Sequence, residues 1–434
     1  MAIDVGPLIP RLAQQRVLVV GDVLLDEYIV GDASRISAEA PVPVLLYESR
    51  HAVLGGAANT AANIAALGGR ATLVGSVGDD VAGREIAHLC ALSGIRLIPI
   101  QDPRPTTRKV RIIGRQQQLI RIDYEQVAPL EAALERRLLA ELAREVTQAD
   151  IVVVSDYAKG LLAGTVCRSL IEMAHAEAKL VVVDPRPQHA AQYVGCDYLT
   201  PNWNESQALA GATEGAPTAD AVERTGGRLR RTLGCNVLMT LGAGGIAFFG
   251  RDARERFTVP AAAREVFDVS GAGDTVAGVF ALATAAGCSH LDAVTLANRA
   301  AGIVVSKRGT ATVSPDELLA RSDAELRLLH RSDLRRVCAE LRASQKRIVA
   351  ASGAFDPLQP DHLQFLQDAR QQGDVLIVGL RHDDGGDRGP VSSQAKRVRM
   401  LLALRSVDYV HIFNDAAPIP FLEAVQPDVH LSCP

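Results

Sequence analysis

Short apolar runs rich in Val, Leu and Ile alternate along the chain with segments whose apolar residues follow helical spacing. The clearest runs are RVLVVGD (16–22), ATLVGSVG (71–78), IVVVSDY (151–157), LVVVDPR (180–186) and CNVLMTLG (235–242). A strand that is apolar on both faces has to be covered on both faces, as in a parallel sheet flanked by helices. The alternation therefore predicts an α/β domain with a mostly parallel sheet over residues 1–315.

Two segments interrupt this rhythm, and the chain changes character after residue 315. Residues 27–48 and 106–125 alternate apolar and polar side chains, which predicts half-exposed strands forming a small projecting β lid. Residues 316–346 are rich in Arg and Leu at helical spacing and predict a helical linker. A second βα rhythm over 347–434 predicts a small second α/β domain.

Composition and charge narrow the classes of partner. The 434 residues include 46 basic and 50 acidic side chains, which are mixed along the chain and give a net charge of −4. This balance provides no electrostatic footprint for nucleic acid or an anionic membrane, so small metabolites are the expected partners. The seven Cys form no C-x-x-C pair, and no run reaches the roughly 20 apolar residues of a membrane helix. We therefore expect a soluble, cytoplasmic protein.

The strongest chemical signal is DVSGAGDTVAG (268–278). Its small residues Gly271, Ala272 and Gly273 precede a helical pattern, so backbone N–H groups at a helix start could converge on an anion. Asp274 would repel a phosphate, and its predicted role is to accept a proton from a hydroxyl that attacks phosphorus. On local sequence alone, Asp274 is equally typical of a first-turn helix carboxylate.

A second segment, GGAANTAANIAALGG (55–69), predicts a helix whose start a ligand can approach closely. Gly55 and Gly56 would permit that approach, and Asn59 could hydrogen-bond sugar hydroxyls. A small-residue helix packed closely on the sheet explains the same stretch. Just beyond the first strand, Asp22 and Asp26 lie where open α/β sheets bind ligands, and they are candidate sugar-binding carboxylates.

Two later segments suit a nucleotide. TPNWNE contains Asn202 and Glu205, whose oxygens suit Mg²⁺ held through water. MTLGAGG contains Thr240, Gly242 and Gly245, where a nucleotide could pass close to the backbone. The first strand is not followed by G-x-G-x-x-G, which disfavours a dinucleotide-binding dehydrogenase.

These segments, in this order, resemble the ribokinase-like family of carbohydrate kinases over residues 15–315. The resemblance implies that Asp274 is the catalytic base and that 271–273 form the anion hole. It implies that Asn202 and Glu205 organise Mg²⁺ and phosphate, that ATP is the cosubstrate, and that the lid mediates a homodimer.

Further stretches resemble the kinase half of the bifunctional enzymes of ADP-heptose synthesis, namely SRISAEAPVPV (34–44), RQQQLIRIDYE (115–125), SDYAKG (155–160) and GTATVSP (309–315). This implies phosphorylation of D-glycero-β-D-manno-heptose 7-phosphate at O1. Basic residues near these stretches could neutralise the 7-phosphate, with Arg111 and Lys159 as the candidates for substrate binding.

The stretch SGAFDPLQPDHLQFLQDAR (352–370) resembles the G-x-F-D-x-x-H-x-G-H motif of cytidylyltransferase-type enzymes. Gly353, Phe355 and Asp356 match the start of the motif. Gln359 and Asp361 stand at the first His and the second Gly, and of the two His only the second, His362, is kept. Asp361 is predicted to cap the helix that follows. The loop 381–393 lacks the Lys of similar enzymes, and the given sequence ends before their Ser/Thr-rich helix start. These departures predict a degenerate nucleotidyltransferase-like domain without adenylyl transfer.

Three alternatives remain open at this point. The chain could be another sugar or phosphosugar kinase of the same family, or a fully bifunctional ADP-heptose synthase. It could also be a ligand-sensing scaffold without catalysis, although the intact GAGD signature argues against that reading.

Overall fold

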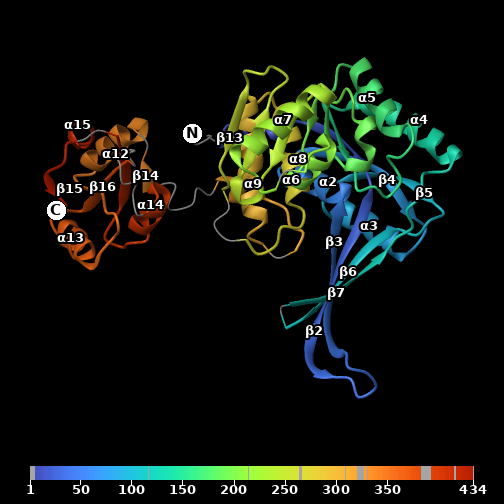
Figure 1. Ribbon diagram of the computed structural model, residues 1–434, viewed down its shortest axis with the longest axis horizontal. Helices are drawn as coiled ribbons and strands as arrows, with labels where there is room; N and C mark the ends of the chain where they lie inside the picture. Colours follow the sequence, from blue (N-terminus) through green and yellow to red (C-terminus); the bar gives the residue numbers. More distant parts are fainter. Residues whose placement is uncertain are drawn as a thin grey trace. The chain divides into compact units, whose positions relative to one another are not determined.

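A computed structural model describes residues 5–115, 117–213, 215–262, 266–307, 309–319, 327–329, 331–382, 392–414 and 417–433. The chain divides into two compact units, Met1–Leu319 and Ala320–Pro434 (Figure 1). Residues 383–391 of the loop that bears on the second predicted site lie outside the described residues.

The first unit is built on a nine-stranded sheet in the order β13-β12-β11-β10-β9-β8-β1-β4-β5. All neighbouring pairs are parallel except β11–β12 and β12–β13. The strands are β1 (Arg16–Gly21), β4 (Arg70–Gly78), β5 (Arg96–Asp102), β8 (Ile151–Ser155), β9 (Leu180–Asp184), β10 (Tyr198–Leu199), β11 (Asn236–Thr240), β12 (Ile246–Phe249) and β13 (Arg256–Val259). Every side chain of β8 is buried, as a strand covered on both faces requires. The predicted mostly parallel α/β sheet is confirmed.

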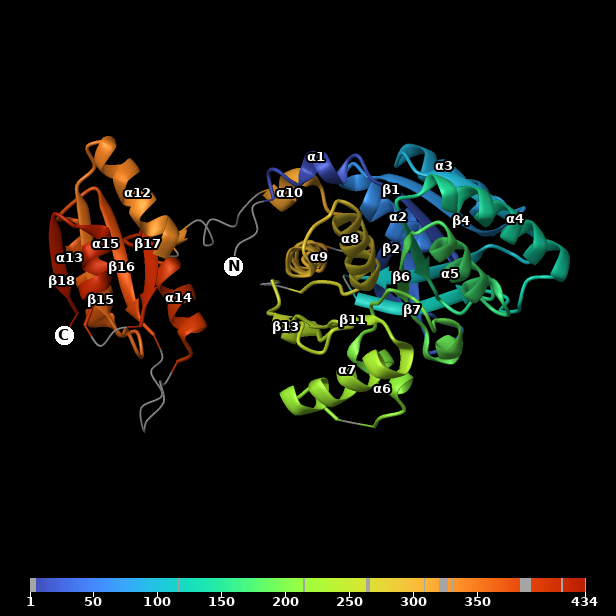
Figure 2. The ribbon, with the colours of Figure 1, turned by 90° about the horizontal axis from the view of Figure 1, so that it is seen from above.

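Two hydrophobic clusters lie on the two faces of this sheet, because alternate residues of each strand point to opposite sides. One face is covered by α1 (Ile9–Leu12), α2 (Ala57–Ala66), α3 (Val81–Leu92), α8 (Ala272–Ala285), α9 (His290–Val304) and α10 (Pro315–Leu319). The other face is covered by α4 (Ala132–Gln148), α5 (Val166–Ala176), α6 (Trp203–Ala210) and α7 (Ala219–Leu233). Helices α8 and α9 lie side by side (Figure 2).

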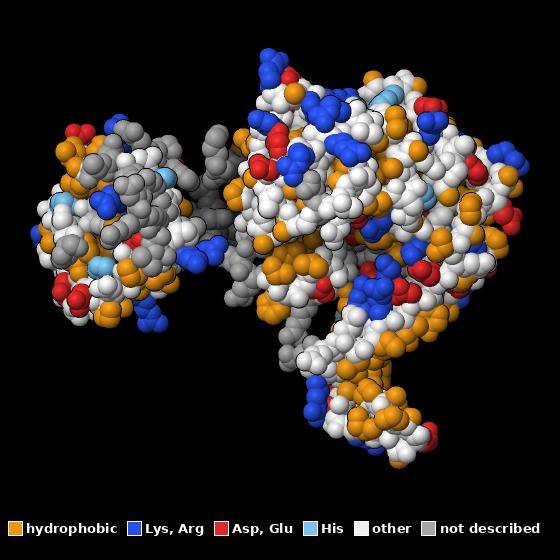
Figure 3. Space-filling view, in the orientation of Figure 1, with side chains coloured by type: hydrophobic (Ala, Val, Ile, Leu, Met, Phe, Trp, Pro, Cys, Tyr) orange, Lys and Arg blue, Asp and Glu red, His pale blue; other side chains and the backbone are white. Residues whose placement is uncertain are grey.

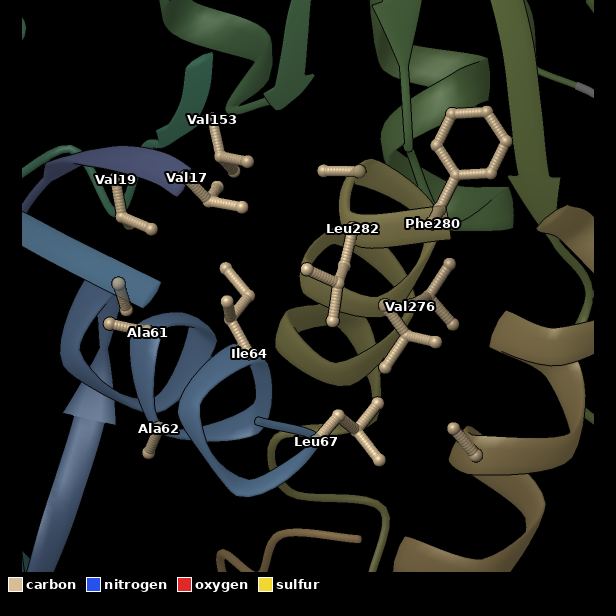
Figure 4. Packing of buried hydrophobic residues seen from close by; sticks show 14 of the residues in the cluster. Val17, Val19, Ala61, Ala62, Ile64, Leu67, Val153, Val276, Phe280 and Leu282 are labelled. Carbon is tan, nitrogen blue, oxygen red and sulfur yellow. The ribbon is translucent and has the colours of Figure 1, made fainter. Parts of the chain in front are cut away.

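The close packing of α2 on α8 positions the candidate site. Side chains of both helices pack with β1 and β8 around Ile64 and Leu282 (Figure 4). A Cβ added to Gly278 of α8 would lie 3.0 Å from the backbone oxygen of Thr60, which is a tight contact, so the glycine favours this close approach of the two helices. Asp274 lies one helical turn before Gly278 and therefore faces the same part of α2.

The lid is a four-stranded sheet in the order β3-β2-β6-β7, formed by β2 (Val23–Ile36), β3 (Pro43–Gly56), β6 (Thr107–Gly114) and β7 (Gln117–Tyr124). It projects from the first unit in Figure 1. The two segments predicted as lid strands are these hairpins. Because β2 starts two residues after β1 ends, the chain runs from the central sheet directly into the lid.

The second unit has a five-stranded parallel sheet in the order β14-β17-β16-β15-β18. Its strands are β14 (Leu328–Leu329), β15 (Ile348–Gly353), β16 (Val375–Arg381), β17 (Tyr409–Phe413) and β18 (Val429–Ser432), and its helices are α12 (Arg331–Ala343), α13 (Pro360–Arg370), α14 (Gln394–Leu402) and α15 (Ile419–Val425). Across the described part of both units, no helix combines the length and apolar character that spanning a membrane requires.

The predicted helical linker at 316–346 needs correction. Strand β14 joins the second sheet, and α12 buries Leu334 and Cys338 against Ile348 and Phe421. The Leu residues at helical spacing therefore form one face of the second unit's core, and α12 is part of that domain.

The predicted cap of α13 is also wrong. The N-cap residue is Gln359, and Asp361 lies inside the first turn. Pro360 occupies the first turn, where its fixed φ angle favours the helix and its missing N–H is not needed. The helix therefore begins before Asp361.

Candidate functional site

Asp274 lies at the start of α8 and is held by three side chains. Its Oδ2 accepts a hydrogen bond from Asn59 Nδ2 at 2.8 Å. Its Oδ1 accepts from Tyr157 OH at 2.9 Å and from Thr60 Oγ1 at 3.2 Å. Burial raises the pKa of Asp274 to about 6, although the three hydrogen bonds oppose the rise. A carboxylate with this pKa can accept a proton near neutral pH.

The backbone before Asp274 forms an open helix start. Gly271 is the N-cap of α8 with φ of 78°, in the left-handed region that favours glycine. A Cβ at Gly271 would lie 2.6 Å from Asn59 Nδ2, so a larger residue would disturb the carboxylate's partner. Among the described residues, and apart from its chain neighbours and the backbone of α8 itself, no atom lies within 4 Å of the position of a Cβ on Gly273. With Ala272 between them, these residues present the positive end of the α8 dipole to a space that an anion can enter.

Two cations flank the ring of Tyr157, which lies just beyond β8. The Lys109 Nζ lies 5.3 Å from the ring centroid, and the Arg186 guanidinium carbon lies 4.8 Å from it. Burial lowers the pKa of Lys109, which belongs to lid strand β6. Positive charge thus approaches Asp274 from the lid and from the loop after β9.

Asp26 lies in lid strand β2 opposite Lys109 in the register of β2 and β6. Its Oδ1 accepts a hydrogen bond from Arg111 Nη1 at 2.5 Å. A Cβ on Gly55 would lie 2.4 Å from Asp26 Oδ2, so Gly55 makes room for this carboxylate. Gly56 follows as the N-cap of α2.

Asp22 is engaged by the backbone of one loop. Its carboxylate accepts hydrogen bonds from the N–H groups of Tyr157, Lys159 and Leu161 at 2.9, 2.9 and 3.2 Å, and only 2% of the residue is exposed. This geometry gives Asp22 the task of holding the loop after β8. The Lys159 ammonium forms an ion pair with Glu125, with its Nζ 2.6 Å from Glu125 Oε2.

Asn202 and Glu205 form a capping box at the start of α6. Asn202 Oδ1 accepts from Glu205 N, and Glu205 Oε2 accepts from Asn202 N, both at 2.9 Å. Glu205 Oε1 pairs with Arg186 Nη1 at 2.5 Å. The N-x-x-E spacing is therefore explained locally by capping. Within the described residues, no three His, Cys, Asp or Glu side chains form a group that could hold a metal ion.

Asp184, at the end of β9, is a further buried carboxylate near this group. Burial, followed by the charges of Glu205 and Asp274, raises its pKa well above the ordinary value. The charge of Arg186 opposes this rise, so positive charge favours the ionised form of Asp184.

The segment after β11 lies beside Asn202. Thr240 and Asn202 form an isolated parallel bridge, and Thr240 N donates to Pro201 O at 2.9 Å. Gly242 and Gly245 lie in the tight turn between β11 and β12. The fold therefore brings the two predicted nucleotide segments together.

Sequence reasoning missed several residues of this cluster, namely Thr60, Tyr157, Asp184 and Arg186. Tyr157 and Arg186 follow the carboxyl ends of β8 and β9, the edge where open α/β sheets bind ligands. Their position just after two predicted strands is the sequence signal that could have identified these two residues as candidates for the site.

In the second unit, the predicted degenerate site lies between β15 and α13. His362 Nδ1 accepts from the Gln359 backbone N–H at 3.0 Å, and its ring packs edge-on to Phe355. Gln359 and Asp361 are both exposed at the start of α13. The one His kept from the motif is thus engaged at the start of the helix.

Residues 14–317 match the pfkB family of carbohydrate kinases, and residues 350–432 match the cytidylyltransferase-like family. The chain is 40% identical to the bifunctional protein HldE of Caulobacter vibrioides over 97% of this chain and 89% of that protein. It is 41% identical to the bifunctional protein HldE of Methylococcus capsulatus over 97% of this chain and 90% of that protein.

Solved structures share the fold of the first unit. Phosphofructokinase-2 from Escherichia coli superposes with a TM-score of 0.60 at 20% identity, over 70% of this chain and 97% of that one. Arabidopsis thaliana ribokinase, complexed with ribose and ATP, superposes with a TM-score of 0.57 at 23% identity, over 71% of this chain and 99% of that one.

Proposed function

The chain belongs to the pfkB family of carbohydrate kinases, and from this premise we propose that it transfers the γ-phosphoryl group of ATP to O1 of D-glycero-β-D-manno-heptose 7-phosphate. The observation that carries the proposal is the buried Asp274 carboxylate beside the open start of α8. The heptose specificity rests on the resemblance of the lid and site segments to enzymes of ADP-heptose synthesis.

Each part of the site has a role in this proposal. Asp274 takes the proton of the attacking sugar hydroxyl, and the N–H groups of 271–273 stabilise the charge that develops on the transferred phosphoryl group. The turn containing Thr240, Gly242 and Gly245 lies along the nucleotide. Closure of the lid would exclude water, which could otherwise accept the phosphoryl group.

A Mg²⁺ ion fits this arrangement only indirectly. Both oxygens of Glu205 already accept hydrogen bonds, so Asn202 and Glu205 would hold the ion through water. The negative charges of Glu205 and Asp274, which raise the pKa of Asp184, support a cation at this edge of the sheet. When bound, Mg²⁺ would neutralise charge on the ATP phosphates.

We assign the substrate 7-phosphate to the group of basic side chains around Lys109 of the lid. Lys109 is half-buried among Asp26 and the cations Arg111, Arg121 and Lys159, and burial lowers its pKa. A phosphate dianion would relieve the repulsion among these cations and replace water lost on lid closure. Arg111 and Lys159 would then exchange part of their pairing with Asp26 and Glu125 for the phosphate.

A substrate panel tests the proposal. Purified protein with ATP and Mg²⁺ is offered heptose 7-phosphate, fructose 6-phosphate, ribose and adenosine, and ADP release is measured. We expect kcat/KM for heptose 7-phosphate to exceed the others by at least about 100-fold, because ribose and adenosine bring no phosphate to the lid cations and the proposed site is specific for the heptose rather than for fructose. Equal or greater efficiency with another sugar would assign a different kinase reaction. ATP binding without turnover on any sugar would favour the scaffold alternative.

The lid also supports a homodimer. All eight residues of β7 are exposed, including the apolar Leu119, Ile120 and Ile122, and Leu46 of β3 is 64% exposed. Hydrophobic side chains gather along the lid in Figure 3. Exposed apolar patches of this kind mark interaction surfaces, and a second lid of the same chemistry is the proposed partner.

Charge placed on this patch should dissociate the dimer. The double variant Leu46→Asp, Ile120→Asp is expected to raise the dimer dissociation constant by about 100-fold or more, since it buries two carboxylates in an apolar interface. Sedimentation velocity over a concentration series measures this effect. Leu92→Asp, on α3 and 71% exposed, is the matched control and should not change the mass. A wild-type protein that sediments as a monomer at all concentrations would refute the dimer.

A further inference from the structure

Tyr157 contacts Asp274 and has no role in the proposed reaction. Its backbone N–H donates to the buried Asp22, which also holds the next turns of the same loop. Its hydroxyl donates to Asp274 Oδ1 at 2.9 Å. Asp22 thus fixes the backbone of Tyr157, and Asp274 accepts its hydroxyl. A movement of the loop would therefore move the hydrogen-bond donor on the Asp274 carboxylate.

The two oxygens of Asp274 differ in their hydrogen bonds. Oδ1 accepts from both Tyr157 and Thr60, whereas Oδ2 accepts from Asn59 alone among the described residues. A carboxylate oxygen has two lone pairs. Oδ1 is therefore saturated, and Oδ2 keeps one lone pair for a further donor.

We propose that Tyr157 is a positioning residue which, together with Thr60, fills Oδ1 and directs Oδ2 of Asp274 to the substrate hydroxyl. The inference rests on the proposed function, in which Asp274 is the base. It assigns the reacting oxygen and names the side chain that selects it.

The ring of Tyr157 also links this oxygen to the lid. Lys109 on lid strand β6 and Arg186 after β9 both lie close to the ring. Cations near an aromatic ring are attracted to its π electrons, so both sides of the site hold the ring in place. The held ring keeps the Tyr157 hydroxyl on Oδ1 of Asp274, which the hydrogen bonds from Thr60 and Asn59 also orient.

Charges from several elements face Asp274 and Tyr157 and contribute to titration there. The charge of Asp26 raises the pKa of Asp274, the charges of Asp184 and Arg186 act on the pKa of Tyr157 in opposite directions, and the Lys109 ammonium lies over the Tyr157 ring. A test of Tyr157 therefore has to remove its hydroxyl alone and leave these charges unchanged.

The variant Tyr157→Phe meets that requirement, since it keeps the ring between the two cations. We expect the acidic limb of the kcat/KM profile, measured with the sugar that wild type prefers, to move up by about one pH unit, because the carboxylate loses a donor that stabilises its charged form. At the high-pH plateau, kcat should fall about tenfold because Asp274 can rotate, while KM changes by less than about threefold. Tyr198→Phe is the matched control, because Tyr198 OH pairs with His290 in the core, and its acidic limb should stay at the wild-type pH.

A second readout is independent of the substrate. Titration of ¹³Cγ-labelled aspartate by NMR, with Asp274→Asn identifying the resonance, should give a higher pKa for Asp274 in Tyr157→Phe than in wild type. An unchanged Asp274 pKa, or a loss of activity without movement of the acidic limb, would overturn the positioning role. Full activity of Asp274→Asn would instead overturn the proposed base, and the two failures are thus distinguished.

Discussion

Replacing Asp274 with Asn is expected to lower turnover by about 10²- to 10⁴-fold, because the amide cannot accept the proton of the attacking hydroxyl. The amide keeps the size of the carboxylate, so the fold and the binding of ATP should be preserved. Coupled measurement of ADP release gives the turnover, and ATP titration gives the affinity. Turnover equal to wild type would show that Asp274 is not the base.

The same substitution also has an expected effect on stability. Burial raises the pKa of Asp274 to about 6 in the folded state, above the ordinary value of 3.8. The unfolded chain therefore releases this proton at lower pH than the folded chain, and ionisation penalises the folded state above about pH 6. At pH 8 the Asn variant should unfold at a temperature no lower than wild type, which separates loss of catalysis from loss of folding.

A matched control addresses the simplest alternative for Asp274, that it is only a first-turn helix carboxylate. Asp220 lies in the first turn of α7 and is exposed. Asp220→Asn removes a charge from a helix start without touching the site, and should cost at most about 1 kcal/mol of stability and no turnover.

In wild type, kcat/KM should fall about tenfold per pH unit below about pH 6 as Asp274 is protonated.

The sequence was sufficient for the fold class and for the family of the kinase. Continuous valine runs such as those of β8 and β9 require burial on both faces, and alternating residues mark the lid, so both features are encoded locally. The predicted ATP-dependent carbohydrate kinase class is confirmed by the family match over 14–317. The individual roles of the site residues remain predictions.

The cluster around Asp274 was less accessible to sequence reading. The contact between Tyr157 and Asp274 joins residues 117 positions apart and depends on the strand order of the central sheet. The capping box of Asn202 and Glu205 shows the opposite case, since its spacing is a local helix signal that explains the pair without a ligand. The helix of 331–343 was assigned to a linker, because an amphipathic pattern predicts one buried face but does not identify the domain against which that face packs.

The second domain is expected to release no pyrophosphate above background when the full chain is given heptose 1-phosphate, ATP and Mg²⁺. Gln359 is uncharged and cannot supply the cation that a protonated His would offer to the ATP phosphates. Asp361 lies in the first turn of α13, where its carboxylate occupies the positive end of the helix that a phosphate would otherwise use. Like charges about 4 Å apart also cost roughly 4 kcal/mol at an effective dielectric near 20.

We do not expect His362 to compensate for these changes, because its Nδ1 accepts a hydrogen bond from the Gln359 backbone at the start of α13. We therefore infer a domain that retains its fold as structural support for the chain, although the relatives it matches are named bifunctional. The same preparation must phosphorylate the 7-phosphate, so that a silent second site is not mistaken for inactive protein. The back-substituted chain, Gln359→His with Asp361→Gly, provides the comparison, and pyrophosphate release from it alone would identify these two residues as the cause. Robust formation of ADP-heptose by the natural sequence would instead show that neither Gln359 nor Asp361 prevents adenylyl transfer.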